Sequence, residues 1–436
     1  MTQVLIIGGG PGGATAAAML AKAGFDVTIL EKERFPRHHV GESLQPGLLR
    51  ILDEHLGVGP ALAAQGFAYK FGAVYVWGES REPWSVIFDR RLEERLAQGP
   101  MTDEELLAGD YEHTWQVDRE RFDAVLLDAA REHGANVRER TEVAAPRVDA
   151  SGRVVGVTTK DGEELDADFV IDASGQRCLL GRAFDLTVPV EDLQATATYT
   201  YYDGAGGVPG ALGRHVQLVV TVDEGWVWFI PISAERTSVG VVSRERKKLS
   251  EDRFHALVAS AALPLDGATH VEPLRYARDW SFTHSRLAGP GWLLLGDAAC
   301  FIDPILSGGV DFAVRGAADA ALALMKTRDG VPEVEALAEY ARNTDRLYRA
   351  HLRLARYWYG NNRSVDGFFW EAHKELAADA LTTPLRAFVY VTSGRYAADQ
   401  HFRVFQAWQE KRMFDKLGVD KARLKTALER RGPKPR

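Results

Sequence analysis

Short apolar runs and one segment of small residues alternate over the first thirty residues of this chain. Residues 4–7 are apolar, glycines follow, residues 14–23 are rich in alanine, and residues 26–30 contain a second apolar run. Short apolar runs bounded by glycine are typical of buried strands, whereas an alanine-rich segment favours a helix. The pattern predicts a strand, a tight turn, a helix and a second strand, which is how a parallel α/β sheet begins.

The predicted turn carries three spaced glycines. Gly8, Gly10 and Gly13 fit the pattern GxGxxG. In this pattern the first glycine permits the turn, the second lets a pyrophosphate approach the backbone, and the third lets helix and strand pack closely. Glu31 follows the second strand, where its carboxylate can accept hydrogen bonds from a ribose. Because all these parts occur together, we interpret them as a dinucleotide site rather than as a structural glycine turn.

Alternation with a period of two is typical of the middle of the chain. Residues 215–222 and 226–232 suggest strands of an antiparallel sheet. In residues 66–77, bulky side chains take the odd positions except at Ala73, and the even positions are small except at Lys70. Read as one strand, this segment places Lys70 on a face of small residues, where a tunnel could run. After residue 332 the pattern becomes helical.

Composition and charge limit the classes of function. The chain has 436 residues, 46% of them hydrophobic and 26% charged, and a formal net charge of -8. An acidic balance argues against nucleic acid or an anionic membrane as partner. No apolar run approaches the ~18 residues of a membrane span, and no secretory leader is recognisable, so we expect a cytoplasmic protein. Cys178 and Cys300 lie far apart without metal-ligand spacing, so we expect no metal site.

Three later segments accompany the glycine turn. They are WQVDRERFDAVLLDAA (115–130), DFVIDASGQR (168–177) and GWLLLGDAACFIDPILSGGVDFAV (291–314). Together with the turn, and in this order, they resemble the FAD motifs of the aromatic-hydroxylase-like flavoproteins. The resemblance implies that Asp297 bonds flavin ribityl or ribose hydroxyls and that Arg119 lies near the flavin, with Ser43 and Pro304 also at the cofactor.

The stretch GWVWFIP, residues 225–231, points to one group within that superfamily. Strand alternation alone would let its two tryptophans and Ile230 share a packed face. The stretch also satisfies WxWxIP at Trp226, Trp228, Ile230 and Pro231. With VGESLQP at 40–46, the chain resembles the FADH2-dependent halogenases of the phenol and pyrrole type.

This resemblance implies a reaction and its parts. Reduced FAD and oxygen give a flavin C4a-hydroperoxide, a bound halide is oxidised to hypohalous acid, and the acid reaches the substrate beside Lys70. Lys70 either polarises the acid by a hydrogen bond or reacts to a haloamine. The WxWxIP residues would separate flavin from substrate. Ser307, Gly308 and Gly309 would hold chloride or bromide at a helix N-terminus, unless that turn only admits the flavin.

At two positions this chain differs from related flavoproteins, and these differences narrow the choice of reductant and of substrate. Hydroxylases that use NAD(P)H directly carry an Asp-Gly pair where this chain has Asp172 and Ala173, so we expect a separate NAD(P)H-dependent flavin reductase to supply FADH2. Tryptophan halogenases carry a Glu where this chain has Leu306. We therefore expect chlorination of a phenolic or pyrrolic group in natural-product biosynthesis, on a free substrate or one tethered to an acyl or peptidyl carrier protein.

The predicted fold is a Rossmann-like FAD-binding domain interleaved with an antiparallel β-sheet substrate domain, followed by a helical region. The expected boundaries are 1–65, 116–185 and 275–330 for the FAD-binding domain, 66–115 and 186–274 for the substrate domain, and 331–436 for the helices. Two other functions stay open: an FAD-dependent aromatic hydroxylase or monooxygenase, and an inactive flavin-binding scaffold.

Overall fold

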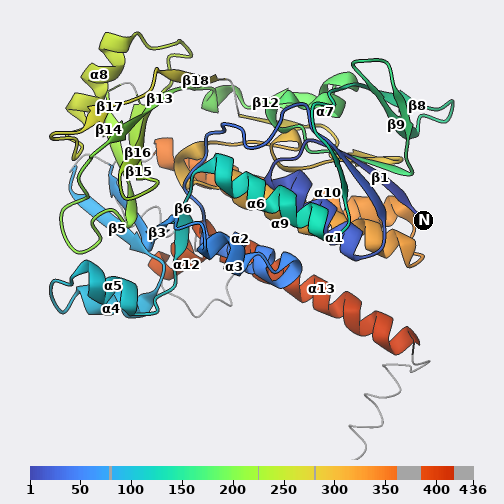
Figure 1. The fold of residues 1–436 in the computed structure, drawn as a ribbon, viewed down its shortest axis with the longest axis horizontal. Helices are drawn as coiled ribbons and strands as arrows, with labels where there is room; N and C mark the ends of the chain where they lie inside the picture. The colour runs from blue at the N-terminus through green and yellow to red at the C-terminus, as the bar shows by residue number, and fades with distance from the viewer. Residues whose placement is uncertain (78–80, 224, 279–280, 361–383, 417–436) are drawn as a thin grey trace, which may run out of the picture.

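A computed structural model describes residues 1–77, 81–223, 225–278, 281–360 and 384–416. Figure 1 shows a layered α/β body, with an antiparallel region at one end and a long C-terminal helix along one side. The mixed α/β class predicted from the sequence is confirmed. The proposed domain boundaries stay a prediction, and residues 361–383 and 417–436 of the expected helical region lie outside the described residues.

A six-stranded sheet forms the centre of the body, in the order β20-β21-β11-β1-β2-β7. All neighbouring pairs are parallel except β20 with β21. Its strands are short and apolar, as expected for strands covered on both faces. Their bounds are Gln3–Ile7 for β1, Asp26–Leu30 for β2, Asn136–Arg138 for β7, Phe169–Asp172 for β11, Ala288–Gly289 for β20 and Trp292–Leu294 for β21.

Helices belong to one core with this sheet, and a small sheet packs beside it. Helix α1 (Pro11–Lys22) contacts both α6 (Arg119–Glu132) and α9 (Gly309–Arg328), and the three lie together in Figure 1. The small antiparallel sheet has the order β10-β9-β8, and β9 contacts β11. Its strands are β8 (Val143–Val148), β9 (Val154–Thr159) and β10 (Glu164–Asp166).

A second large sheet lies at the other end of the body. Its main path is β17-β13-β16-β15-β14-β4-β5, and β18 pairs with β13. The pairs are antiparallel, as predicted, except that β14 and β4 run parallel. The bounds are β4 (Gly72–Val76), β5 (Pro83–Ile87), β13 (Thr196–Asp203), β14 (Val216–Val222), β15 (Gly225–Pro231), β16 (Arg236–Ser243), β17 (Thr269–His270) and β18 (Arg275–Arg278).

The two faces of this sheet bury different cores. Val227 and Phe229 of β15 pack in a cluster that includes Phe254 of α8 (Glu251–Ser260). Trp226, Trp228 and Ile230 pack on the opposite face, in a cluster that includes residues of the C-terminal helices. The alternation expected of GWVWFIP is therefore present, since successive side chains of a strand point to opposite faces.

Residues 66–77 do not form the single strand that the sequence suggested. The chain breaks at Phe71, so β3 (Ala68–Lys70) pairs with β6 (Thr114–Gln116) while β4 joins the large sheet. Phe71 donates its backbone N–H to His215 and accepts a backbone hydrogen bond from Phe88. The break separates Lys70 from the alternation of β4, which a period-two pattern alone cannot reveal.

The C-terminal region is helical as far as the structure describes it. Helix α10 (Glu333–Gly360) packs on α9, and α13 (Arg395–Lys416) packs on α9 and α2. Among the described residues, no helix is both long and apolar enough to span a membrane. The remaining elements are α2 (Pro46–Ile51), the π-helical turn Leu52–Leu56, α3 (Gly59–Ala63), α4 (Arg90–Leu96), α5 (Asp103–Ala108), α7 (Leu179–Ala183), α12 (Pro384–Thr392), β12 (Thr187–Pro189), β19 (Phe282–His284), and 3-10 turns at Gly175–Arg177, Glu191–Leu193, Gly296–Ala298 and Pro304–Leu306.

The close approach of β5 to β4 predicts that Gly72 tolerates no side chain. A Cβ added there would lie 2.1 Å from the carbonyl oxygen of Val86 on the paired strand. We expect Gly72→Ala to lower the free energy of unfolding by about 1–3 kcal/mol, because strand β4 would have to shift away from β5. Urea unfolding measures the change. Gly360→Ala is the control, since its Cβ would meet nothing within 4 Å, and equal midpoints for both variants would contradict the prediction.

Candidate functional site

A cavity of about 570 Å³ is lined by residues of both large sheets and of the loops between them. Its lining brings together most of the residues that the sequence singled out, although they come from five separate segments of the chain. These are Gly8, Gly10, Glu31, Ser43, Arg119, Trp226, Trp228, Ile230, Asp297, Pro304, Ser307 and Gly309. Gly13, Lys70, Pro231 and Gly308 were also singled out and are not among its lining residues.

The glycine turn at the start of α1 has the shape that a pyrophosphate requires. Gly8 has φ +102°, and a Cβ there would lie 2.5 Å from the carbonyl oxygen of Ala173. A Cβ at Gly13 would lie 2.0 Å from the carbonyl oxygen of Gly8, so helix and strand touch at this point. Gly10 caps α1, whose first amides have no intrahelical partners and form the positive end of the helix dipole, which attracts anions.

Glu31, the residue expected from the sequence to bind a ribose, lines the cavity. The residue is 4% exposed, and its Oε2 accepts a hydrogen bond from the backbone N–H of Gly9 at 2.6 Å. Its Oε1 accepts one from the backbone N–H of Glu33 at 2.9 Å. Two amides thus fix the carboxylate at the cavity wall, and its remaining lone pairs can accept from hydroxyl groups.

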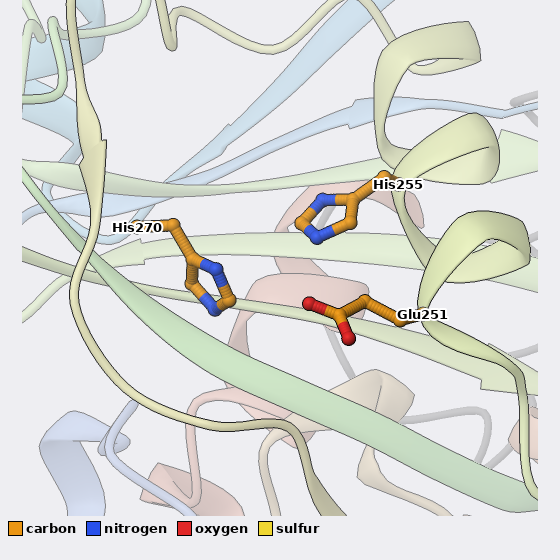
Figure 2. A group of neighbouring side chains, drawn as sticks. All are labelled: Glu251, His255 and His270. Atoms are coloured by element: carbon orange, nitrogen blue, oxygen red, sulfur yellow. The ribbon is translucent and has the colours of Figure 1, made fainter.

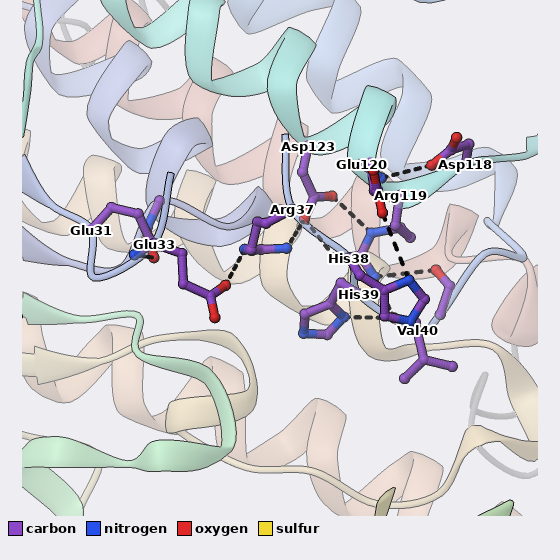
Figure 3. A network of polar contacts seen from close by, with 12 residues as sticks. Glu31, Glu33, Arg37, His38, His39, Val40, Asp118, Arg119, Glu120 and Asp123 are labelled. Atoms are coloured by element: carbon purple, nitrogen blue, oxygen red, sulfur yellow. Dashed lines mark hydrogen bonds and ion pairs between the residues drawn. The ribbon is translucent and has the colours of Figure 1, made fainter. Parts of the chain in front are cut away.

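Two arginines share one buried carboxylate beside the glycine turn (Figure 3). Arg119 binds both oxygens of Asp123, at 2.7 and 3.0 Å, and Arg37 donates to Oδ2 of the same residue at 3.0 Å. Burial alone would raise the pKa of Asp123, but Arg119 and Arg37 outweigh it and hold that pKa below its usual value. The trio keeps a net positive charge, and both arginines line the cavity. Arg37 suits a phosphate, and no motif in the sequence had marked it.

The loop that contains Arg37 also supplies polar groups, from residues 38 to 43. Arg119 also donates to the backbone oxygen of Val40 at 2.7 Å, which ties the loop to α6. Burial, with Arg119 nearby, lowers the pKa of His39 to about 4, so this imidazole is neutral at pH 7. Glu42 is buried and accepts a hydrogen bond from the hydroxyl of Tyr201 at 2.8 Å. Burial raises the pKa of Glu42.

Gln217 of β14 joins this loop to the turn before α9. Its Oε1 accepts hydrogen bonds from Ser43 Oγ at 2.6 Å and from Ser307 Oγ at 2.9 Å. Sequence reasoning had selected both serines but neither Gln217 nor Glu42. Glu42 stands within the VGESLQP stretch, which could have marked it, whereas only the register of β14 reveals Gln217.

Asp297 faces the cavity from the turn after β21. Burial raises the pKa of its carboxyl to about 7, and Arg119 acts in the opposite direction. Both residues line the cavity. A carboxyl in this position can accept hydrogen bonds from the hydroxyl groups of a cofactor and donate one when protonated.

The two tryptophans of β15 form one wall of the cavity, and their indoles are held by hydrogen bonds. Trp226 donates its Nε1–H to Tyr359 Oη at 2.8 Å, and Tyr359 donates its hydroxyl to Asp303 Oδ2 at 2.9 Å. Trp228 donates to Ser238 Oγ at 3.1 Å. Its ring lies over Gly240 of the adjacent strand, since a Cβ there would be 2.2 Å from the ring.

The turn at residues 304–309 leads into α9. Ser307 adopts a left-handed conformation with φ +53°, and Gly308 is the cap of the helix. The first backbone N–H groups of a helix have no partners within it, so this end can receive an anion. Gly308 and Gly309 also line a small cavity of about 20 Å³, together with Asp297 and His351. Leu306, at the position where tryptophan halogenases carry a Glu, is buried.

Lys70 lies behind the cavity wall. Its side chain is 1% exposed, and Nζ donates to the backbone oxygen of Leu44 at 2.8 Å. Nζ also lies 5.5 Å from the ring centre of Phe88. Burial lowers the pKa of the ammonium group to about 7, and no ion pair involving Lys70 occurs in the described part of the chain. Leu44 adjoins Ser43, which lines the cavity, so the hydrogen-bond acceptor of Lys70 is next in sequence to a cavity residue.

The donor set of this cavity fits FAD: amides and an arginine for the phosphates, a fixed carboxylate for the ribose, and a second acid for further hydroxyl groups. Its volume lies within the range of cofactor sites. The remaining wall is aromatic and apolar, as a flavin ring requires.

Comparisons with known proteins agree with this geometry. The family model described as tryptophan halogenase matches residues 3–98 and 90–415. A tryptophan 2-halogenase of Chondromyces crocatus is 33% identical over 400 residues, covering 86% of this chain and 72% of that protein. A 1H-pyrrole-2-carbonyl peptidyl-carrier-protein chlorinase of Pseudomonas fluorescens is 33% identical over 332 residues, covering 72% of this chain and 74% of that protein.

A solved structure is similar over nearly the whole fold. The myxobacterial chondrochloren halogenase CndH, an FAD-dependent enzyme, matches with a TM-score of 0.72 and 32% identity, covering 90% of each chain. Flavin-dependent halogenases use FAD and a halide, which are the cofactors expected from the sequence. With its cavity, its motifs and these similarities, this chain belongs to the tryptophan halogenase family of flavin-dependent halogenases.

Proposed function

We propose that this halogenase chlorinates a phenolic or pyrrolic group in natural-product biosynthesis, with Lys70 as its catalytic residue. The observation that carries the proposal is the burial of Lys70 close to the cavity, with no ion-pair partner among the described residues. Reduced FAD, when bound, would react with molecular oxygen and so provide the oxidant for the halide. The residues of this chain separate that chemistry from the substrate and deliver the oxidised halogen.

Lys70 can work near neutral pH because burial has lowered its pKa. A pKa of about 7 leaves both the ammonium and the amine populated at pH 7. The ammonium can donate a hydrogen bond to hypohalous acid, and the amine can react with it. Both routes need a lysine without a carboxylate partner, and desolvation is the only cause of its lowered pKa.

The halide is proposed to bind at Ser307, Gly308 and Gly309. The backbone amides at the start of α9 offer donors without a metal. Gln217 Oε1 accepts a hydrogen bond from the hydroxyl of Ser307, which fixes the turn against β14. Chloride or bromide can occupy such a site, and an assay with each halide separates them.

The proposed substrate class is supported by the lack of a carboxylate at position 306. Leu306 is apolar where a tryptophan halogenase has an acid, so no carboxylate at this position assists the reacting ring. Phenols and pyrroles are electron-rich enough to react without that help. The similarity to an enzyme that chlorinates a pyrrole on a peptidyl carrier protein supports a carrier-tethered substrate as one form of it.

A separate NAD(P)H-dependent flavin reductase is proposed to supply reduced FAD. The support is the sequence of the middle motif, in which Asp172 is followed by Ala173 rather than glycine. Asp172 accepts backbone hydrogen bonds from Ser174 and Leu180, so its carboxylate is used within the turn before α7. An aromatic hydroxylase, the alternative function, would give oxygenated products that contain no halogen.

One prediction concerns Lys70→Ala. With a flavin reductase, NADH, oxygen and chloride or bromide, the wild type should halogenate members of a panel of phenols, pyrroles and carrier-bound acyl groups, read by product mass and isotope pattern. Lys70→Ala should lower the rate by about 10²-fold or more, because proton transfer by a positioned side chain contributes that much. Flavin absorbance should show unchanged FAD binding.

Controls separate the possible roles of Lys70. Lys160→Ala removes an exposed lysine paired with Glu142 and should keep full activity. Loss of FAD from Lys70→Ala would make the lysine structural. Halogen-free hydroxylated products from the wild type would overturn the chlorination proposal and favour the hydroxylase.

The lowered pKa of Lys70 predicts how the stability of the protein depends on pH. The folded state holds this proton more weakly than the unfolded state, so stability rises with pH between about 7 and the ordinary lysine pKa of 10.5. Relative to Lys70→Met, the wild type should gain up to about 1.4 kcal/mol per pH unit over this window. Urea unfolding at pH 7, 8 and 9 measures the difference, and parallel curves for the two proteins would contradict a lowered pKa.

A further prediction concerns Trp226 and Trp228, the two tryptophans of the cavity wall. Trp226→Ala and Trp228→Ala should lower the ratio of halogenated to hydroxylated product, with hydrogen peroxide released, because the flavin side and the substrate side would no longer be separated. Phe229→Leu, on the opposite face of β15, is the matched control and should leave this ratio unchanged. An unchanged ratio in both tryptophan variants would return GWVWFIP to a packing role.

A further inference from the structure

Three side chains of a kind that can ligate metals lie close together (Figure 2), on the face of the large sheet that carries Val227 and Phe229. Glu251 and His255 belong to α8, four residues apart, and therefore share one side of that helix. His270 ends the edge strand β17, which lies beside β13. The carboxylate and the two rings point toward one another across the gap between helix and strand.

The donor atoms are already close. One atom from each of the three residues lies within 4.8 Å of the others. A zinc ion at 2.0–2.2 Å from three such donors requires separations of about 3–4 Å. Glu251 is exposed and its side chain can rotate, so a movement of about 1 Å would complete the set. The backbones of both histidines are fixed by regular elements.

Hydrogen bonds orient both imidazoles for an ion. Thr200 Oγ1 donates its only hydrogen to the backbone oxygen of Glu272 at 2.6 Å. It also lies 2.9 Å from His270 Nε2, so Nε2 must carry the proton and Nδ1 keeps a free lone pair. His255 Nδ1 lies 3.3 Å from the hydroxyl of Tyr202, which leaves Nε2 directed into the gap. Such outer hydrogen bonds are typical of metal-ligating histidines.

We propose that Glu251, His255 and His270 bind a divalent transition-metal ion of the zinc type. Two imidazoles and one carboxylate suit zinc, nickel or cobalt, whereas magnesium and calcium require oxygen donors. Three protein ligands leave a fourth position for water or for another molecule. The ion would link α8 to an edge strand of the sheet, outside the FAD cavity, whose lining includes none of the three residues.

The sequence did not point to this site. His255 and His270 are separated by fourteen residues that include the end of a helix, and no short metal-ligand spacing joins them. The expectation that the chain holds no metal considered cysteine and Cys/His spacings alone. The pairing of β17 with β13, which places His270 opposite Tyr202, brings the third ligand into position.

Isothermal titration of the full-length, FAD-loaded protein with Zn²⁺ tests the proposal, with the visible absorption of bound Co²⁺ as a second readout. We expect one ion per chain and a rise in the melting temperature with Zn²⁺ but not with Mg²⁺. His255→Ala, His270→Ala and Glu251→Gln should each remove that rise and weaken binding. Thr200→Val should weaken Zn²⁺ binding by about 10–100-fold, because the orientation of His270 would be lost.

Controls decide where any bound ion lies. His133→Gln removes an imidazole elsewhere on the surface and should bind Zn²⁺ like the wild type. Glu251→Gln keeps the test open if a histidine variant fails to fold, since Glu251 is exposed. The proposal is overturned if the wild type binds no Zn²⁺, or if binding survives in the double variant His255→Ala, His270→Ala.

Discussion

One amide oxygen holds the parts of the active cavity in register. Oε1 of Gln217 accepts two hydroxyl hydrogen bonds, from Ser43 in the loop before α2 and from Ser307 in the turn before α9. A carbonyl oxygen has two lone pairs, so both are used. The loop that contains Ser43, the turn before α9 and strand β14 of the large sheet thus meet at the side chain of Gln217. All three parts contribute residues to the cavity lining, so Gln217 helps to set the shape of the cavity.

Around that point the enzyme buries charge without full compensation. Lys70 has one carbonyl oxygen as its hydrogen-bond acceptor, while Asp297 and Asp303 have pKa values raised to about 7 by burial. Buried ionisable groups of this kind lower stability and are typical of functional sites. Arg119 and Asp123 show the contrasting solution, because a bidentate ion pair compensates their burial.

Local patterns in the sequence predicted the local parts of this structure. The glycine turn, Glu31 and the alternation of β15 each depend on residues that are close in sequence, so a spacing rule could find them. The partners of those residues come from elsewhere in the chain. Arg37 reaches Asp123 across 86 positions and Trp226 reaches Tyr359 across 133, and no periodicity records such contacts.

The same limit explains what the sequence described wrongly. Residues 66–77 show a regular period of two, yet the strand divides at Phe71 because its two halves pair with different partners. Strand pairing is a long-range property, and a one-residue irregularity changes which face a side chain occupies. Lys70 was therefore singled out by its small neighbours and by the family resemblance, whereas its burial against Leu44 came from the fold.

Tyr359 gives the C-terminal helices a part in the evolution of this enzyme. It lies in the last turn of α10, where its hydroxyl receives the indole N–H of Trp226 and donates to Asp303. A descendant that shortened α10 to admit a larger aromatic compound would leave that N–H without a partner, at a cost of about 1–3 kcal/mol if it stayed buried. The length of α10 and the position of the Trp226 indole are thus inherited together, and changing one requires a compensating substitution in the other.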